Sequence, residues 1–275
     1  MRVAVFVRTS LLIALALGPL ARVATAQTPA APPAATTPAA TAPSAECLDW
    51  TRALRDMMAQ DARLRDWPNL GRYRAANDEL KRSGDAVPVV FLGDSITDAW
   101  DDEGRGGFFP GKHYVNRGIG GQTTPQMLVR LRPDVLAHHP KVMVLLAGTN
   151  DIAGNTGPMS DDDIEQNIAA IAELSAANGV KVVLAGILPI SDYHKKPDQV
   201  AQVIRRPMSR IAALNTWIKS YAAAHGHVFL DYAPGVADAR GMLKADLSDD
   251  DLHPNAQGYA LMAPLAEAAI AQALR

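Results

Sequence analysis

Cysteine is nearly absent from this sequence: Cys47 is the only one in 275 residues, so no disulfide can form within the chain. Aromatic residues make up only 5%, and neither sign of charge dominates, since 27 Lys and Arg stand against 29 Asp and Glu. These shortages exclude a small disulfide-stapled scaffold and give no basic field that would attract nucleic acid. Apolar residues are plentiful at 48%, which is enough for one large core or two modest ones.

The first 26 residues have the order of a secretory signal peptide. Residues 1–8 carry arginine and no acid, residues 11–17 are an unbroken apolar run, and residues 24–26 (Ala-Thr-Ala) form a small-residue cleavage site. The apolar run is too short for a bilayer-spanning helix. We therefore predict an exported protein, periplasmic or extracellular, with no integral membrane span after cleavage at 1–26. A retained N-terminal anchor is the alternative interpretation.

The next two segments differ sharply in composition. Residues 27–45 are mostly Ala, Pro and Thr, which bury little surface and favour an extended tether. From residue 46, apolar side chains such as Trp50, Leu54 and Met58 recur at helical spacing, which predicts a helix whose apolar stripe packs against the protein. Trp67-Pro68 is expected to end that helix, and residues 73–80 to form a second. We assign 46–83 to a helical N-terminal extension.

Beyond it, residues 84–275 alternate between apolar, β-branched runs and helical patterns. The predicted helices begin near Thr124, near Asp161 after Ser160 as N-cap, at Pro207 and at Pro254. Such alternation indicates βαβ units, and hence a parallel sheet with right-handed crossovers and helices on both faces. The predicted strands are Val87–Leu92, His113–Val115, Lys141–Ala147, Lys181–Leu188 and His227–Leu230.

Chemically useful residues follow these strands or precede the last helix. They are Gly93-Asp94-Ser95, the segment Asn116–Thr123 with its Gly118-Ile119-Gly120-Gly121 turn, Gly148-Thr149-Asn150-Asp151, and Asp249-Asp250-Asp251-Leu252-His253-Pro254. In an open parallel sheet the ligand crevice lies outside the carboxyl ends of the strands, so we expect these segments to meet there.

Together these segments supply the parts of an acyl-transfer site. A serine hydroxyl is a weak nucleophile that needs a base, for which His253 is the candidate, and the imidazole needs a carboxylate on its other nitrogen. Asp250, three residues before His253, has the spacing to reach the ring, whereas Asp249 and Asp251 do not. The backbone N–H groups of Ser95 and Gly121 and the side-chain amide of Asn150 are the predicted oxyanion-hole donors.

In this order the four segments resemble the sequence blocks of the SGNH (GDSL-type) hydrolases, and the second block is similar to the platelet-activating-factor acetylhydrolase-like branch. The resemblance covers about residues 87–275. It implies Ser95 as nucleophile, His253 as base, Asp250 as the residue that orients it, and no cofactor or metal. It also implies an α/β fold, a flavodoxin-like three-layer α/β/α sandwich with a five-stranded parallel sheet (SGNH hydrolase fold), for the catalytic domain 84–275.

We therefore predict an exported serine esterase that hydrolyses short-chain acyl esters, with acetyl groups on carbohydrates as a candidate substrate class. The partner is a small-molecule or glycan ester, and the segment 192–206 is expected to overhang the crevice. A lysophospholipase of the same family is one alternative. A metal-dependent phosphoesterase is another, with oxygen and imidazole ligands from Asp94, Asp98, Asn150, Asp151 and His253. A catalytically silent carbohydrate-binding module is the third.

Overall fold

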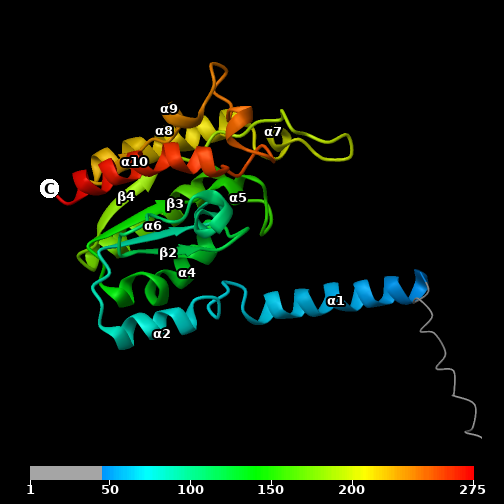
Figure 1. Cartoon of the computed structure of the whole chain (residues 1–275), viewed down its shortest axis with the longest axis horizontal. Coiled ribbons are helices and arrows are strands. Elements are labelled where there is room, and N and C mark those ends of the chain that lie inside the picture. The colour runs from blue at the N-terminus through cyan, green and yellow to red at the C-terminus, as the bar shows by residue number, and fades with distance from the viewer. Residues whose placement is uncertain (1–44) are drawn as a thin grey trace, which may run out of the picture. The chain divides into compact units, whose positions relative to one another are not determined.

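The computed structural model describes residues 45–275 (Figure 1). The predicted signal peptide, 1–26, and all but the last residue of the tether, 27–45, lie outside the described residues. Within 46–83, helix α1 covers Ala45–Arg65 and α2 covers Arg74–Ser83. The expectation that the apolar stripe of α1 packs is wrong for the side chains described, because Trp50 is 78% exposed and Met58 65%. Spacing predicts the helix but does not reveal whether anything covers its apolar side.

Five strands form one sheet in the order β2-β1-β3-β4-β5, and every neighbouring pair is parallel. The strands are β1 Val89–Gly93, β2 Tyr114–Gly118, β3 Val142–Leu146, β4 Lys181–Ala185 and β5 Val228–Leu230. This confirms the predicted five-stranded parallel sheet and its flavodoxin-like order. The direction of winding reverses at β1, so the carboxyl ends of β1 and β3 flank the topological switch point.

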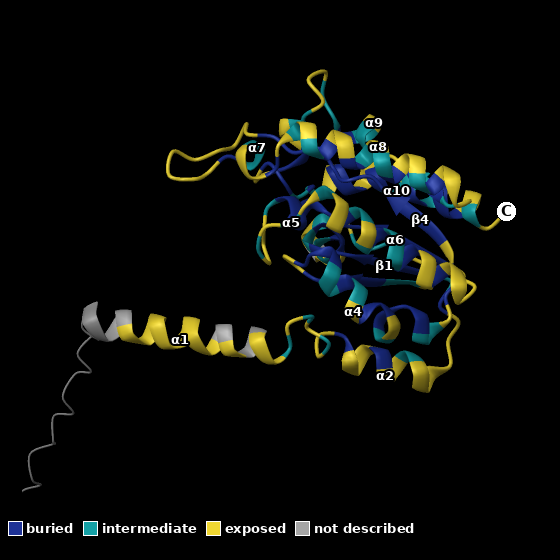
Figure 2. Cartoon of the chain, turned by 180° about the vertical axis from the view of Figure 1, so that it is seen from behind, coloured by how far each residue is buried: buried dark blue, intermediate teal, exposed yellow. Residues whose placement is uncertain are grey.

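Helices cover both faces of the sheet. The strands are accordingly mostly buried, and their buried residues are dark blue in Figure 2. Alternate strand residues divide between two cores: Val90 and Leu92 join the core under α4, α6 and α8, whereas Val89 and Phe91 join the core under α10. The three-layer sandwich is therefore confirmed. The covering helices are α4 Thr124–Asp134, α6 Asp161–Ala177, α8 Met208–Ala224 and α10 Ala256–Ala273.

Short helices lie in the connections between the strands and the longer helices. They are α3 Ser95–Asp98, α5 Thr149–Ile152, α7 Gln202–Arg205, α9 Ala233–Val236 and the 3₁₀ turns η1 Ala99–Asp101, η2 Glu103–Arg105, η3 Leu136–His138 and η4 Ala245–Leu247. The longer helices start close to their predicted positions. At α6, for example, the Ser160 hydroxyl accepts the Asp163 N–H at 3.1 Å, which satisfies a helix N–H that has no partner within the helix.

The second strand differs from its prediction, because it runs through Gly118 instead of ending at Val115. Its polar residues stay in the sheet because their side chains find partners. Asn116 donates to the Thr97 carbonyl at 2.6 Å and accepts the Gly118 N–H at 2.8 Å. Arg117, 5% exposed, is likewise hydrogen-bonded. Polarity alone therefore predicted the end of β2 three residues too early.

In residues 45–275, no helix has both the length and the apolar character needed to cross a bilayer.

Candidate active site

The chain turns sharply from β1 into α3 at Ser95, the first residue of that helix. Asp94 caps α3: its Oδ1 accepts the Ile96 N–H at 2.9 Å. The cap gives the Ile96 N–H a hydrogen-bond partner. Ser95 lies at the positive N-terminal end of the short helix, beside the carboxyl edge of the sheet. Gly118, at the end of β2, passes so close that an added Cβ would lie 2.1 Å from the Asp98 nitrogen. Only glycine fits there.

Ser95, His253 and Asp250 form one continuous hydrogen-bonded line. The Ser95 Oγ lies 2.8 Å from His253 Nε2, and His253 Nδ1 lies 2.6 Å from Asp250 Oδ2. The structure therefore brings Ser95 to the pair Asp250 and His253, which lies more than 150 residues further along the chain. The ring nitrogen that faces Asp250 is the one expected to carry the proton, since a carboxylate accepts and does not donate.

Asp250 is held by its own turn. Its Oδ1 accepts the backbone N–H of His253 at 2.8 Å and of Leu252 at 3.1 Å. Partial burial by itself would raise the pKa of the Asp250 carboxyl. The hydrogen bonds from the ring and backbone N–H of His253 outweigh burial and hold that pKa well below its usual range. Asp250 is thus an ionised acceptor throughout the neutral range.

The neighbouring aspartates have different surroundings. Asp249 is exposed. Asp251 is 3% exposed, has a left-handed backbone with φ of 68°, and accepts hydrogen bonds from the Ser191 hydroxyl at 2.7 Å and the His194 N–H at 2.9 Å. Asp251 therefore joins the loop after β4 to the turn that carries His253. Sequence reasoning missed this anchoring role.

Two of the predicted oxyanion donors, Gly121 and Asn150, belong to segments that meet near Ser95. A Cβ added to Gly120 would lie 3.8 Å from the Ser95 Cβ, so the glycine turn after β2 passes directly beside the serine. Gly121 has a φ of 77°, which favours glycine. Asn150, in α5 after β3, is 3% exposed and donates its side-chain N–H to the Gln122 carbonyl at 3.0 Å. The segments after β1, β2 and β3 therefore converge at one edge.

Asp94 is an unusual neighbour for this site. Its side chain is fully buried, and its Oδ2 has no hydrogen-bond partner among the residues described. Burial raises the pKa of Asp94 to about 6. Asp94 and Asp151 were also candidate metal ligands, but Asp151 instead accepts the Thr124 N–H and hydroxyl at 2.9 and 2.6 Å. Within residues 45–275, no three His, Cys, Asp or Glu side chains are grouped to hold a metal ion.

Two basic residues at the end of α7 were not singled out from the sequence. Arg206 donates to the Asn150 side chain at 3.4 Å, and Arg205 to Asn155 at 3.3 Å. They lie in the segment 192–206, whose residues from Tyr193 to Gln199 are exposed. The available signal was only the pair of adjacent arginines in a segment expected near the crevice. Neither residue type nor spacing shows that one of the two is buried.

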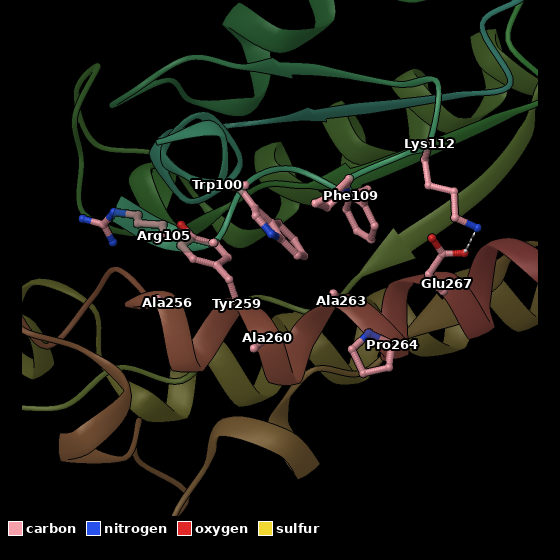
Figure 3. A pocket seen from close by; sticks show the side chains of 13 residues that line it. Trp100, Arg105, Phe109, Lys112, Ala256, Tyr259, Ala260, Ala263, Pro264 and Glu267 are labelled. Carbon is pink, nitrogen blue, oxygen red and sulfur yellow. Dashed lines mark hydrogen bonds and ion pairs between the residues drawn. The ribbon is translucent and has the colours of Figure 1, made fainter. Parts of the chain in front are cut away.

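A separate pocket of about 290 Å³ lies between α10 and the segment 100–112 (Figure 3). Its lining combines aromatic rings, small residues of α10 and an ion pair at one end: Trp100, Phe109, Tyr259, Ala260, Ala263, Lys112 and Glu267. Neither Ser95 nor His253 lines it. Arg105 does, and its guanidinium donates to the carbonyl of Pro254. The pocket thus borders the residue after His253 without containing the candidate site.

Comparison with known proteins agrees with this geometry. The GDSL-like Lipase/Acylhydrolase family matches residues 91–261. A proposed acylhydrolase of Bacteroides fragilis is 38% identical, with a TM-score of 0.67, and the match covers 76% of this chain and 99% of that one. A GDSL-like lipase of Bacteroides thetaiotaomicron is 36% identical, with a TM-score of 0.65, and the match covers 75% and 98%. The platelet-activating factor acetylhydrolase IB subunit alpha1 of Bos taurus is 29% identical over 179 residues, 62% of this chain and 69% of its own length.

The fold and the matches define the class of protein: an ester-bond hydrolase with an α/β fold and a flavodoxin-like sheet. The chain belongs to the GDSL-like lipase and acylhydrolase family, within the SGNH hydrolase superfamily.

Proposed function

We propose that Ser95, His253 and Asp250 are the catalytic triad of a serine esterase. The observation that carries this proposal is the line from Ser95 Oγ through the imidazole to Asp250, with spacings of 2.8 and 2.6 Å. In the first half-reaction, His253 Nε2 takes the Ser95 proton while Oγ attacks the acyl carbon. His253 then returns the proton to the departing alcohol, and an acyl-serine ester remains. In the second half-reaction His253 takes a proton from a water that attacks this ester, and it returns the proton to Ser95 Oγ as the bond between the acyl carbon and Oγ breaks and the carboxylic acid leaves.

The negative charge on the tetrahedral intermediate needs donors that are already in place. We assign this role to the backbone N–H groups of Ser95 and Gly121 and to the second N–H of the Asn150 amide. The support is that the glycine turn passes beside Ser95, where a Cβ added to Gly120 would lie 3.8 Å from the Ser95 Cβ, and that Asn150 is hydrogen-bonded to the Gln122 carbonyl of the same segment. Asn150 spends one N–H on the Gln122 carbonyl, so the other remains for substrate.

For the substrate we propose short acyl esters, with acetyl groups on a glycan as the favoured class. The curated relative is by name an acetylhydrolase, which favours a two-carbon acyl group. The segment 192–206 exposes polar residues such as Tyr193 and Lys195, which offer contacts to a polar alcohol portion, and it also exposes the apolar Val200 and Ile204. Rates on p-nitrophenyl esters of increasing chain length test this proposal. A maximum at acetate or propionate is expected, and a maximum at long chains would favour the lysophospholipase alternative.

We further propose that the enzyme is exported after cleavage of residues 1–26, on the basis of the signal-peptide pattern alone. N-terminal sequencing of the protein recovered outside the cytoplasm is expected to begin at Gln27. A chain that still begins at Met1 would contradict cleavage and favour a retained anchor.

Replacement of the nucleophile tests the proposed chemistry. Ser95→Ala removes one hydroxyl from a partly exposed side chain, so the thermal unfolding midpoint is expected to stay near that of the wild type while hydrolysis of p-nitrophenyl acetate is abolished. Treatment of the wild type with a chelator is expected to leave the rate unchanged. Substantial activity in Ser95→Ala, or loss of wild-type activity to the chelator with recovery on adding a divalent cation, would refute the serine mechanism.

A further inference from the structure

Arg206 is a buried cation whose hydrogen bonds all go to neutral groups. The residue is 2% exposed, and its guanidinium forms no ion pair with any carboxylate in the part of the chain that the structure describes. Its acceptors are all neutral: Nε donates to both the carbonyl and the hydroxyl of Thr149 at 3.0 Å, and the terminal nitrogens donate to the side chains of Gln202 and Asn150. Burying a guanidinium without an ion-pair partner costs free energy of folding, which suggests that Arg206 serves a function.

Arg206 helps to fix the orientation of the Asn150 side chain. Its Oδ1 accepts from Arg206 Nη2 at 3.4 Å and from Asn155 Nδ2 at 3.0 Å, while its Nδ2 donates to the Gln122 carbonyl at 3.0 Å. If the amide flipped, its NH₂ group would face two donors and its oxygen would face a carbonyl. The three contacts therefore permit one orientation only, and they fix the direction of the remaining N–H of Asn150.

Asn155 ties the two sides of the site together. Its NH₂ group donates to the Asn150 side chain and also to the Gly121 carbonyl at 3.1 Å. Its own Oδ1 accepts from Arg205 at 3.3 Å. The consecutive arginines at the end of α7 thus support two of the three proposed oxyanion donors: Arg206 contacts Asn150 directly, and Arg205 contacts Asn155, which bonds both Asn150 and the Gly121 carbonyl. Figures 1 and 2 both show α7 and α5 at the same edge of the molecule.

The positive charge of Arg206 also affects the proposed oxyanion hole. Burial, aided by the neighbouring Arg205 charge, lowers the pKa of Arg206 to about 10, so the guanidinium stays protonated at neutral pH. Asp94 and Asp250 are the anions that act on it, and both oppose the lowering. A fixed cation behind a neutral amide donor stabilises negative charge that appears in front of that donor, and here such charge develops only in the transition state.

We propose that Arg206 and Asn155 are positioning residues of the oxyanion hole: together they lock the Asn150 amide toward the reacting oxygen, and Arg206 supplies the positive charge behind it. This inference rests on the proposed esterase function. It assigns a task to two residues that touch neither the nucleophile nor the base.

A double-mutant cycle tests the proposal in the full chain with p-nitrophenyl acetate. Arg206→Gln is expected to lower kcat by about tenfold to hundredfold, with KM changed by less than about threefold, because the lost stabilisation belongs to the transition state. In an Asn150→Ala background the same substitution is expected to change kcat by less than about twofold, since its effect passes through Asn150. Equal losses in the two backgrounds, or no loss in the wild-type background, would overturn the proposal.

Asn155→Ala provides a second variant should Arg206→Gln not fold, because Asn155 is exposed. The same pattern is expected: lower kcat, nearly constant KM, and no further loss in Asn150→Ala. Arg210→Gln is the matched control for a basic residue, since Arg210 donates to Asp161 and to the carbonyls of Ile152 and Met159. Its thermal midpoint is expected to fall while kcat stays near that of the wild type. A kcat loss in this control as large as in Arg206→Gln would mean that the effect is general destabilisation.

The outcome for Ser95→Ala separates this inference from the proposed function. If Ser95→Ala is inactive and the cycle shows independent effects, only the positioning role is wrong. If Ser95→Ala remains active, the esterase mechanism itself fails, whatever the cycle shows.

Discussion

Replacing Asp250 with Asn tests how the imidazole is held. Asp250 uses both oxygens: Oδ1 accepts two backbone N–H groups, at 2.8 and 3.1 Å, and Oδ2 accepts from the ring at 2.6 Å. Asn has one oxygen, and the two backbone N–H groups compete for it more strongly than the ring does. The NH₂ group then faces His253 Nδ1, and a donor can bond that nitrogen only when it is unprotonated.

The consequence reaches Ser95. With Nδ1 unprotonated, the single proton of the neutral ring moves to Nε2, which lies 2.8 Å from the serine oxygen. A protonated Nε2 cannot accept the serine proton, so the base is lost without a change of shape. When the orienting Asp of a triad becomes Asn, kcat falls by up to about 10⁴-fold. The Asp250 side chain is 52% exposed, so water can partly replace it, and we expect a loss between about 10² and 10⁴.

The assay is kcat on p-nitrophenyl acetate, with the thermal midpoint measured in parallel. Asp249→Asn is the matched control, because it makes the same chemical change on an exposed neighbour and is expected to leave kcat near that of the wild type. A loss below about threefold in Asp250→Asn, or equal losses at both positions, would refute this account of the imidazole's orientation.

Three further outcomes are expected. Asn150→Ala lowers kcat by about 10² to 10³ with little change in KM, and a change confined to KM would contradict its oxyanion role. Asp94→Asn is more stable than the wild type at pH 7 by differential scanning calorimetry, and the gap closes as the pH falls below about 6, because a raised carboxyl pKa makes ionisation costly in the folded state. A constant gap would contradict burial of an ionised Asp94. Asp251→Asn costs about 1–3 kcal/mol in urea unfolding, since it weakens the hydrogen bonds from Ser191 and His194, and unchanged stability would refute the anchoring role.

Much of the fold follows from local pattern. Apolar β-branched runs separated by amphipathic helices predicted all five strands and the helices that cover them, since periodicity and burial act over a few residues. The sequence-based predictions failed where contacts with residues far away in the sequence determine the structure. Asn116 and Arg117 look like loop residues and yet continue β2, because their side chains donate hydrogen bonds to the Thr97 carbonyl and to Asn77. For α1 the opposite happened: its apolar stripe was expected to pack but is exposed, since apolar periodicity does not show which surface, if any, covers the helix.

The candidate site divides in the same way. Ser95, Asn150 and His253 were predictable, because each follows a strand or precedes a helix and parallel strands end at one edge. Their supports were not. Arg206 and Asp251 are buried polar residues in exposed-looking segments, and their contacts join the loop after β4 to α5 and to the turn before α10. Those pairings depend on tertiary geometry that no local spacing encodes.

Covalent labelling of the nucleophile tests the central claim most directly. An organophosphate such as diethyl p-nitrophenyl phosphate phosphorylates an activated serine and mimics the tetrahedral intermediate. Peptide mapping by mass spectrometry is expected to find one modification per chain, on Ser95, formed in step with the loss of esterase activity and absent from Ser95→Ala and His253→Ala. Modification of another residue in step with inactivation, or full activity after complete labelling of Ser95, would contradict the proposed esterase mechanism.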